Sequence, residues 1–247
     1  MMAEKEKIQE EEYGFPYHYL PTATDGFQLT RVWRWGIQYM ATIKYLIEQV
    51  NNLDFDKFLD VGCGDGRLVK EVSENFCHKN VNGIDTSDRA ILLAKALNPG
   101  LQFQVGDVCD LDKRECYDVA SCIEVIEHIP PDQLGRFIEG LASVIKQDGY
   151  LFLTTPTTNK KVSQKHYQHF DYGQIEELLN PYFKIVDLRY IHKPNRVFGV
   201  LMKLLSNKWF SLNHPKLSNS IFQYYYKNVF LNESEDGHRF FVVAIKE

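Results

Sequence analysis

An acid–histidine cluster, Glu124-Val125-Ile126-Glu127-His128, directly follows a stretch that is typical of a buried strand. Histidine has an ordinary pKa of about 6.5, so its neutral ring can take a proton near physiological pH. A neighbouring carboxylate can orient such a ring. We therefore predict that the cluster moves a proton at a bound ligand, with His128 as the candidate base.

A glycine-rich turn, Gly62-Cys63-Gly64-Asp65-Gly66, follows the apolar stretch 58–61. Glycines let the backbone turn sharply and approach a ligand closely. A dinucleotide-binding GxGxxG sequence would have its third glycine where this chain has Arg67. Asp60 and Asp65 flank the turn, and two carboxylates suit a cationic ligand better than a pyrophosphate. The turn therefore favours S-adenosylmethionine over NAD.

Two more acids end strand-like stretches further along the chain. Asp85 lies about twenty residues after the turn, where a ribose diol would bind, and Asp107 follows the next stretch. In parallel sheets ligands bind at the carboxyl ends of the strands, so these acids should face one pocket. The alternative is that Asp60, Asp65 and Asp107 only cap helices and turns, and their joint spacing disfavours it.

The elements that must position these residues alternate between strands and helices. We expect helices at 29–50, 65–77, 87–97, 172–180 and from Pro130 through Ile145, and strands at 57–61, 81–84, 101–105, 117–123, 150–154, 183–191 and 239–245. Such alternation predicts an α/β fold with a doubly wound, Rossmann-like sheet and helices on both faces. No simple crossover helix precedes the last strand, so it could run antiparallel.

The expected organisation is an N-terminal tail and lid helix over residues 1–56, followed by one catalytic domain over 57–247. A cap insertion at 194–236 would precede the last strand. An apolar helical stripe there, with interleaved Arg196, Lys203 and Lys208, predicts a helix packed on the sheet edge, or alternatively peripheral contact with a membrane. The aromatic segment 13–19 could form a lid or simply a packed arm.

Composition narrows the class of protein. The chain has 247 residues and a net charge of −5, which disfavours a nucleic-acid partner. The N-terminus lacks an apolar core typical of a secretory signal, and no apolar run is long enough to span a bilayer. Without a CxxC pair, the five cysteines suit reduced, packed thiols in a cytoplasmic protein: Cys63, Cys77, Cys109, Cys116 and Cys122.

With these motifs in place, the sequence resembles the class I methyltransferases that use S-adenosylmethionine, from about residue 57 to 191 and again in the last strand. The matching pieces are 60–66, Asp85, 106–108, 117–128 and 149–156. The resemblance implies a seven-stranded sheet whose last strand is antiparallel. It also implies cofactor contacts from Asp60, Gly62, Cys63, Gly64, Asp85, Thr86, Asp107, Val108, Cys122 and Ile123.

The acid–histidine cluster is also similar to two narrower groups, ubiquinone-pathway O-methyltransferases and small-RNA 2′-O-methyltransferases. In the RNA enzymes two Glu and two His bind a divalent metal, and here His166 and His169 lie in the corresponding region. Oxygen and nitrogen ligands of this kind suit Mg or Mn. We favour a site without metal, in which the catalytic residues are Glu124, Glu127, His128 and His169.

The resulting prediction is an S-adenosylmethionine-dependent methyltransferase that acts on a hydroxyl of a small molecule and releases S-adenosylhomocysteine. The alternatives are a metal-assisted RNA 2′-O-methyltransferase and a non-catalytic adenosylmethionine-binding subunit. The intact glycine turn disfavours the latter. The sequence leaves the acceptor, the methylated atom and the choice between monomer and homodimer open.

Overall fold

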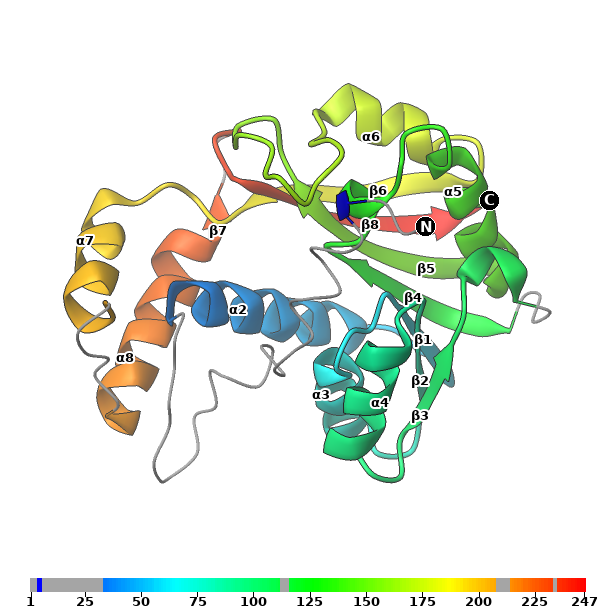
Figure 1. Ribbon diagram of the computed structural model, residues 1–247, viewed down its shortest axis with the longest axis horizontal. Coiled ribbons are helices and arrows are strands. Elements are labelled where there is room, and N and C mark those ends of the chain that lie inside the picture. The colour runs from blue at the N-terminus through cyan, green and yellow to red at the C-terminus, as the bar shows by residue number, and fades with distance from the viewer. Residues whose placement is uncertain (1–3, 6–32, 112–115, 208–213, 233–234) are drawn as a thin grey trace.

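A computed structural model of the chain describes residues 4–5, 33–111, 116–207, 214–232 and 235–247 (Figure 1). The aromatic segment 13–19 lies outside the described residues. Among those residues, a single mixed sheet forms the centre of the molecule, in the order β3-β2-β1-β4-β5-β8-β6-β7. Its strands are β1 Lys57–Val61, β2 Asn80–Asp85, β3 Gln102–Val105, β4 Tyr117–Ile123, β5 Ile145–Pro156, β6 Phe183–Ile191, β7 Leu231–Asn232 and β8 Arg239–Lys246.

The predicted seven-stranded Rossmann-like sheet with an antiparallel last strand is confirmed. β1 pairs in parallel with β2 and β4, and β4 pairs in parallel with β5. The last strand, β8, is antiparallel to both β5 and β6. The two residues of β7 add a short eighth strand at the β6 edge, which the sequence reasoning did not predict because so short a pairing has no periodic pattern.

Helices cover both faces of the sheet. The described helices are α2 Trp33–Val50, α3 Arg67–Asn75, α4 Asp88–Leu97, α5 Leu134–Val144, α6 Tyr172–Leu179, α7 Arg196–Leu205 and α8 Pro215–Tyr225, with short helical turns η2 Val108–Asp110, η3 Ile126–His128 and η4 Tyr226–Phe230. In Figure 1, α2 lies between α8 and α3, and α5 and α6 lie on the opposite side. No described helix is long and apolar enough to cross a membrane.

Two buried clusters lie on the two faces of the sheet, because successive strand residues point to opposite sides. Phe58, Val119 and Phe152 belong to the cluster beneath α2, α3 and α4. Their chain neighbours Leu59, Ala120 and Leu151 belong to the cluster beneath α5 and α6. Burial on both faces explains why apolar residues point to both sides of these strands.

The structure differs in detail from three local expectations. The helix after Pro130 begins at Leu134 and not at the prolines, which form a turn. The apolar stripe of α7 divides, because Phe198 and Met202 are buried while Val197, Val200 and Leu204 are exposed. The five cysteines form no disulfide, but Cys77 is exposed and is not a packing residue. The proposed boundary near residue 56 stays a prediction.

Candidate active site

The glycine turn places the backbone between β1 and α3 in a conformation that needs glycine. Gly62, Gly64 and Gly66 have φ values of 75°, 54° and 80°, in the left-handed region that glycine tolerates best. A Cβ on Gly62 would lie 2.4 Å from Cγ2 of Val125. The turn is therefore held tightly against the segment that follows β4.

The strand-end acids are tied to this turn by hydrogen bonds. The backbone N–H groups of Gly64 and Ser87 each donate to the carboxylate of Asp85 over 2.9 Å. Asp107 accepts from the N–H of Cys109 over 2.9 Å at the start of η2, so it does cap a helical turn. α3 has Gly66 as its N-cap and no side-chain cap. The capping alternative thus accounts for Asp107, whereas Asp60 pairs with the side chain of Ser121.

Asp60 is a buried acid near the carboxyl end of β1. It is 3% exposed, and the hydroxyl of Ser121 donates to its Oδ1 over 2.7 Å. Burial raises the pKa of Asp60 to about 7, even though the Ser121 hydrogen bond opposes the rise. A cation bound beside this carboxylate would favour its ionised form.

One cavity of about 780 Å³ runs along this edge of the sheet. Its lining includes eight of the ten predicted cofactor residues, and also the cluster residues Glu124, Glu127 and His128. Gly64 and Cys122 are not part of the lining. The side chain of Cys122 lies in the core beneath α5, because residues alternate along β4, and its predicted cofactor contact stays a prediction.

At the far end of the cavity, η3 brings His128 and Glu127 toward the loop that follows β5. His128 Nδ1 lies 3.2 Å from the carbonyl oxygen of Lys165. Only a protonated Nδ1 can pair with a carbonyl, so the contact assigns the proton to Nδ1 and the lone pair to Nε2. A general base needs a lone pair, and this tautomer provides one at Nε2.

A second histidine chain lies behind His128. His169 Nδ1 donates to the carbonyl of Lys160 over 2.7 Å, and His166 Nδ1 lies 2.8 Å from His169 Nε2. The first contact leaves Nε2 of His169 as an acceptor, so His166 donates from Nδ1 and its own Nε2 carries a lone pair. Burial first, and then His128, lower the pKa of His166 to about 2. His166 is therefore neutral, and it lines the cavity while His169 orients it from behind.

Glu127 is fully buried below the two histidines. Its Oε2 accepts from the hydroxyl of Thr155 over 3.3 Å, whereas Oε1 has no hydrogen-bond partner among the described residues. Burial, and then the neighbouring Glu124, raise the pKa of Glu127. A buried carboxylate oxygen without a partner is costly, so the geometry favours either a proton or a cation at this position.

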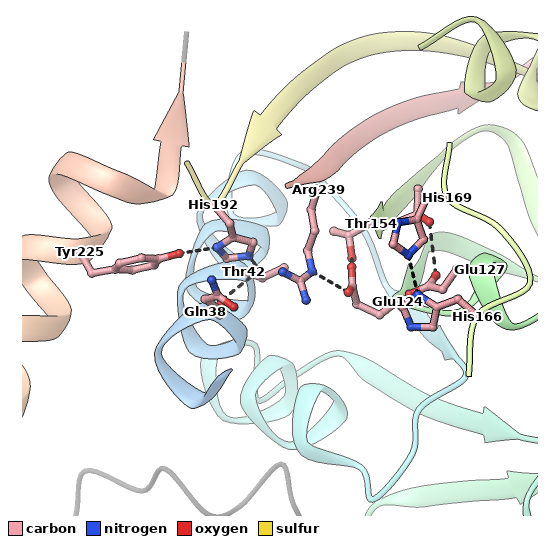
Figure 2. Close-up of polar contacts among 11 residues, drawn as sticks. Gln38, Thr42, Glu124, Glu127, Thr154, His166, His169, His192, Tyr225 and Arg239 are labelled. Atoms are coloured by element: carbon pink, nitrogen blue, oxygen red, sulfur yellow. Dashed lines mark hydrogen bonds and ion pairs between the residues drawn. The ribbon is translucent and has the colours of Figure 1, made fainter. Parts of the chain in front are cut away.

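Basic residues also line the end of the cavity that holds the acid–histidine cluster, which we call the acceptor end. The guanidinium of Arg239 pairs with Glu124, Nε to Oε2 over 2.6 Å. Lys160 also faces the cavity, and burial followed by repulsion from Arg239 lowers the pKa of its ammonium group. Figure 2 shows Arg239 between the Glu124–Glu127 group and a second polar group around His192.

The second polar group joins three separate elements. His192 follows β6 with a φ of 61°, an uncommon value for a residue other than glycine. Its Nδ1 lies 2.6 Å from the hydroxyl of Tyr225 in α8, and its Nε2 lies 3.1 Å from the hydroxyl of Thr42 in α2. Thr42 in turn lies 3.2 Å from the carbonyl of Gln38. These hydrogen bonds can all point the same way: the Tyr225 hydroxyl donates to His192, His192 donates to the Thr42 hydroxyl, and Thr42 donates to the carbonyl of Gln38 (Figure 2).

Sequence reasoning missed several residues that line the acceptor end: Gln38, Thr42, Lys160, His192 and Arg239. A usable signal existed for two of them. His192 directly follows the carboxyl end of β6, and Arg239 is the first residue of the antiparallel β8, whose beginning meets the same edge of the sheet. The others depend on how α2 and the loop after β5 pack, which no local pattern reveals.

The fold and the cavity together define the architecture of a class I methyltransferase. The sequence matches the family described as "Methyltransferase domain" over residues 29–193. The chain therefore belongs to this family, and the predicted resemblance to methyltransferases is confirmed.

Curated relatives carry the name ubiquinone biosynthesis O-methyltransferase. The chain is 30% identical to the one from Nitrosomonas europaea and 34% identical to the one from Coxiella burnetii, in each case over 125 residues and 48% of this chain. These alignments cover 52% and 51% of the two relatives. The chain thus spans about half the length of the curated relatives it matches.

Solved structures share the fold over nearly the whole chain. Magnesium protoporphyrin IX methyltransferase from Synechocystis, with bound S-adenosylmethionine, superimposes with a TM-score of 0.63 at 16% identity and covers 100% of this chain and 99% of its own. The N-methyltransferase NodS from Bradyrhizobium japonicum, with S-adenosylhomocysteine, gives 0.62 at 11% identity, with 99% of both chains covered. At these identities the likeness concerns the fold alone.

Proposed function

We propose that this chain transfers the methyl group of S-adenosylmethionine to a hydroxyl of a small organic molecule. One observation carries the proposal: a single cavity joins the strand-end acids Asp60, Asp85 and Asp107 to the acid–histidine cluster. The first group suits a cationic, ribose-bearing donor, and the second suits an acceptor that must lose a proton.

At the donor end, the proposed roles follow from charge and hydrogen bonding. Asp60 and the turn at Gly62 face the cationic methionine part. Asp85, already fixed by two backbone N–H groups, accepts from the ribose hydroxyls, and Asp107 with Val108 borders the adenine. Because these groups are held before the ligand binds, little ordering is needed at the moment of reaction.

At the acceptor end, His128 takes the proton. The acceptor oxygen attacks the methyl carbon in line, the carbon–sulfur bond breaks, and its electron pair returns to sulfur as S-adenosylhomocysteine leaves. The hydroxyl proton moves to Nε2 of His128, whose Nδ1–H stays on the carbonyl of Lys165. Lys160 and Arg239 provide positive charge beside the oxygen as it loses its proton.

The names of the curated relatives support a hydroxyl acceptor, and the net charge of −5 argues against RNA as the substrate. The decisive experiment combines a binding measurement with a product screen. Calorimetry should show that S-adenosylmethionine binds the wild type, that Asp85→Asn weakens binding at least tenfold, and that the exposed control Asp110→Asn does not. A screen of small-molecule extracts with trideuteromethyl donor should then yield a product heavier by the labelled methyl group and stable to mild base, as an ether is.

Absence of donor binding by the wild type would refute the proposal as a whole. A labelled product that is cleaved by mild base would instead identify a carboxyl acceptor. A labelled amine or carbon product would also contradict the hydroxyl assignment while leaving donor binding intact.

A metal-assisted form of the same reaction is the second candidate. Glu127, His128 and His166 each offer a ligand atom, and these atoms lie within 4.8 Å of one another. The tautomers described above place a lone pair on Nε2 of His128 and of His166, and Oε1 of Glu127 has no hydrogen-bond partner among the described residues. These three are the candidate ligand atoms, and His169 holds His166 in place, as outer partners of metal ligands commonly do. The set therefore fits a divalent ion, which when bound would lower the pKa of an acceptor hydroxyl.

This candidate has three protein ligands, whereas the resemblance to the small-RNA enzymes implies two Glu and two His. Glu124 is engaged by Arg239, and His169 lies behind His166. Calorimetry with Mn²⁺ on the chelator-treated wild type tests the site directly. His166→Ala should abolish binding, and His214→Ala, on an exposed helix cap, should not. Full activity after exhaustive chelation would exclude this form and leave the metal-free one.

A further inference from the structure

Positive charge is concentrated in one segment of this acidic chain. Residues 192–232 contain Lys193, Arg196, Lys203, Lys208, Lys216 and Lys227 and no Asp or Glu, although the whole chain carries a net charge of −5. This segment includes α7 and α8, which lie at one end of the molecule, away from β1, β2 and β3 (Figure 1). Such segregation creates a local positive field that the net charge conceals.

The outer face of α7 is apolar and exposed. Val197, Val200 and Leu204 are 71%, 58% and 63% exposed. Their spacing of three and four residues places them on one side of the helix. The inner side is already occupied, because Phe198 and Met202 are buried in the core. The outer apolar strip is therefore additional to what the fold requires.

Exposed cations border this strip. Arg196 and Lys203 lie one and three residues from Val197 and Val200, on the adjoining side of the same helix, and Lys193 precedes it. Long basic side chains at such positions can place their charge at lipid headgroups while the apolar residues enter the acyl boundary. Lys216, in the first turn of α8, is a further exposed cation of the same segment.

We propose that the outer face of α7 binds the surface of an anionic lipid bilayer. The combination of an apolar strip with a basic border complements both the acyl and the headgroup layers of such a surface. A nucleic acid would pair with the cations but leave the three apolar side chains in water. A symmetric second copy would bring the two basic borders together. This proposal is independent of the acceptor's identity and of the methyl transfer itself.

Flotation with large unilamellar vesicles tests the binding. The wild-type chain should bind vesicles of phosphatidylcholine that contain about 30% phosphatidylglycerol. It should bind pure phosphatidylcholine vesicles at least tenfold more weakly at low salt. Added salt should weaken binding because it screens the headgroup charge. Val200→Gln/Leu204→Gln should reduce affinity more than tenfold, and Arg196→Gln/Lys203→Gln roughly twenty-fivefold, at about fivefold per cation.

The matched control changes an equally exposed apolar residue and a cation on another helix. Leu92, on α4, is 68% exposed, and Lys95 is exposed on the same helix. Leu92→Gln/Lys95→Gln should leave vesicle binding unchanged. Every variant should retain the wild-type Tm, since none of the altered side chains is buried.

Three outcomes would overturn the proposal. The wild type fails to bind anionic vesicles at low salt, the α7 variants bind as the wild type does, or the control variant loses as much binding as they do. Sedimentation of the wild type as a dimer that Val200→Gln/Leu204→Gln converts to a monomer would show that a second copy covers this face, and would equally overturn it.

Discussion

The guanidinium of Arg239, at the start of the last strand, lies 2.6 Å from the carboxylate of Glu124, which follows β4. Glu124 itself has a φ of 58°, so its backbone is in a conformation that ordinary residues seldom adopt. Its other oxygen accepts from the hydroxyl of Thr154 over 3.1 Å. The first carboxylate of the cluster is thus fixed from two neighbouring strands.

This pair predicts a measurable coupling energy. Glu124 and Arg239 side chains are 26% and 13% exposed, and hydrogen-bonded charge pairs shielded from water contribute about 1.5–3 kcal/mol. We expect a coupling of roughly 1–3 kcal/mol between Glu124→Gln and Arg239→Met in a double-mutant cycle of urea unfolding. The control cycle uses Asp110 and Arg136, which are 69% and 68% exposed, and its coupling should stay below about 1 kcal/mol. Equal coupling energies in the two cycles would contradict a stabilising role for the shielded Glu124–Arg239 pair.

Gly62 should be required for donor binding. In Gly62→Ala the new methyl would meet Val125 at 2.4 Å while φ remains at 75°, so the loop must move. We expect a stability loss of about 1–3 kcal/mol and a large loss of S-adenosylmethionine affinity by calorimetry. Gly100→Ala is the control, because Gly100 has a φ of 95° and the new methyl would meet nothing within 4 Å. It should lose stability through φ strain and keep the affinity.

The buried Asp60 should make donor binding depend on pH. Its pKa in the folded, unliganded protein is raised to about 7 from an ordinary 3.8, and a cationic ligand favours the carboxylate. Binding should therefore release a proton below pH 7 and strengthen as pH rises from 6 to 8. Calorimetry in buffers of different ionisation enthalpy measures this release, and Asp60→Asn should abolish it.

The raised pKa of Asp60 makes stability fall as pH rises, whereas donor binding strengthens. A raised carboxyl pKa means that the folded state binds the proton more tightly than the unfolded state does, so stability falls as pH rises from about 4 to about 7. Without ligand, Asp60→Asn should consequently raise the Tm at pH 8 even though it weakens donor binding. A lowered Tm at pH 8 would argue against the raised pKa.

The hydroxyl of Tyr225 should act through His192. Tyr225→Phe removes only the donor that lies 2.6 Å from His192 Nδ1, which costs about 1–2 kcal/mol for a buried hydrogen bond. We expect a higher KM for the acceptor and an unchanged affinity for S-adenosylmethionine, because His192 lines the acceptor end. Tyr224→Phe, at a residue that is 46% exposed, should change neither quantity. If Tyr225→Phe and Tyr224→Phe raised KM equally, the hydroxyl of Tyr225 would not act through His192.

Much of the donor end follows from the sequence, because it depends on local order. A glycine turn after a strand and acids at the ends of the next two strands must meet once those strands are parallel neighbours. Asp60, Asp85 and Asp107 therefore reach one cavity. The exception at this end, Cys122, depends on which side of β4 each residue faces, and a strand that is buried on both sides gives no alternation from which to tell.

Only the tertiary structure decided the acceptor end. Arg239 reaches Glu124 across 115 residues and His192 reaches Thr42 across 150, so no short-range pattern could place them together. The two histidines after β5 also divided their roles by packing, with His166 in the cavity and His169 behind it. Strand order and the antiparallel direction of β8 bring these ends to one edge, and that arrangement arises from the sheet as a whole. The sequence alone thus determined the fold class and the residues of the proposed donor end, whereas long-range packing determined which side chains line the other end of the cavity.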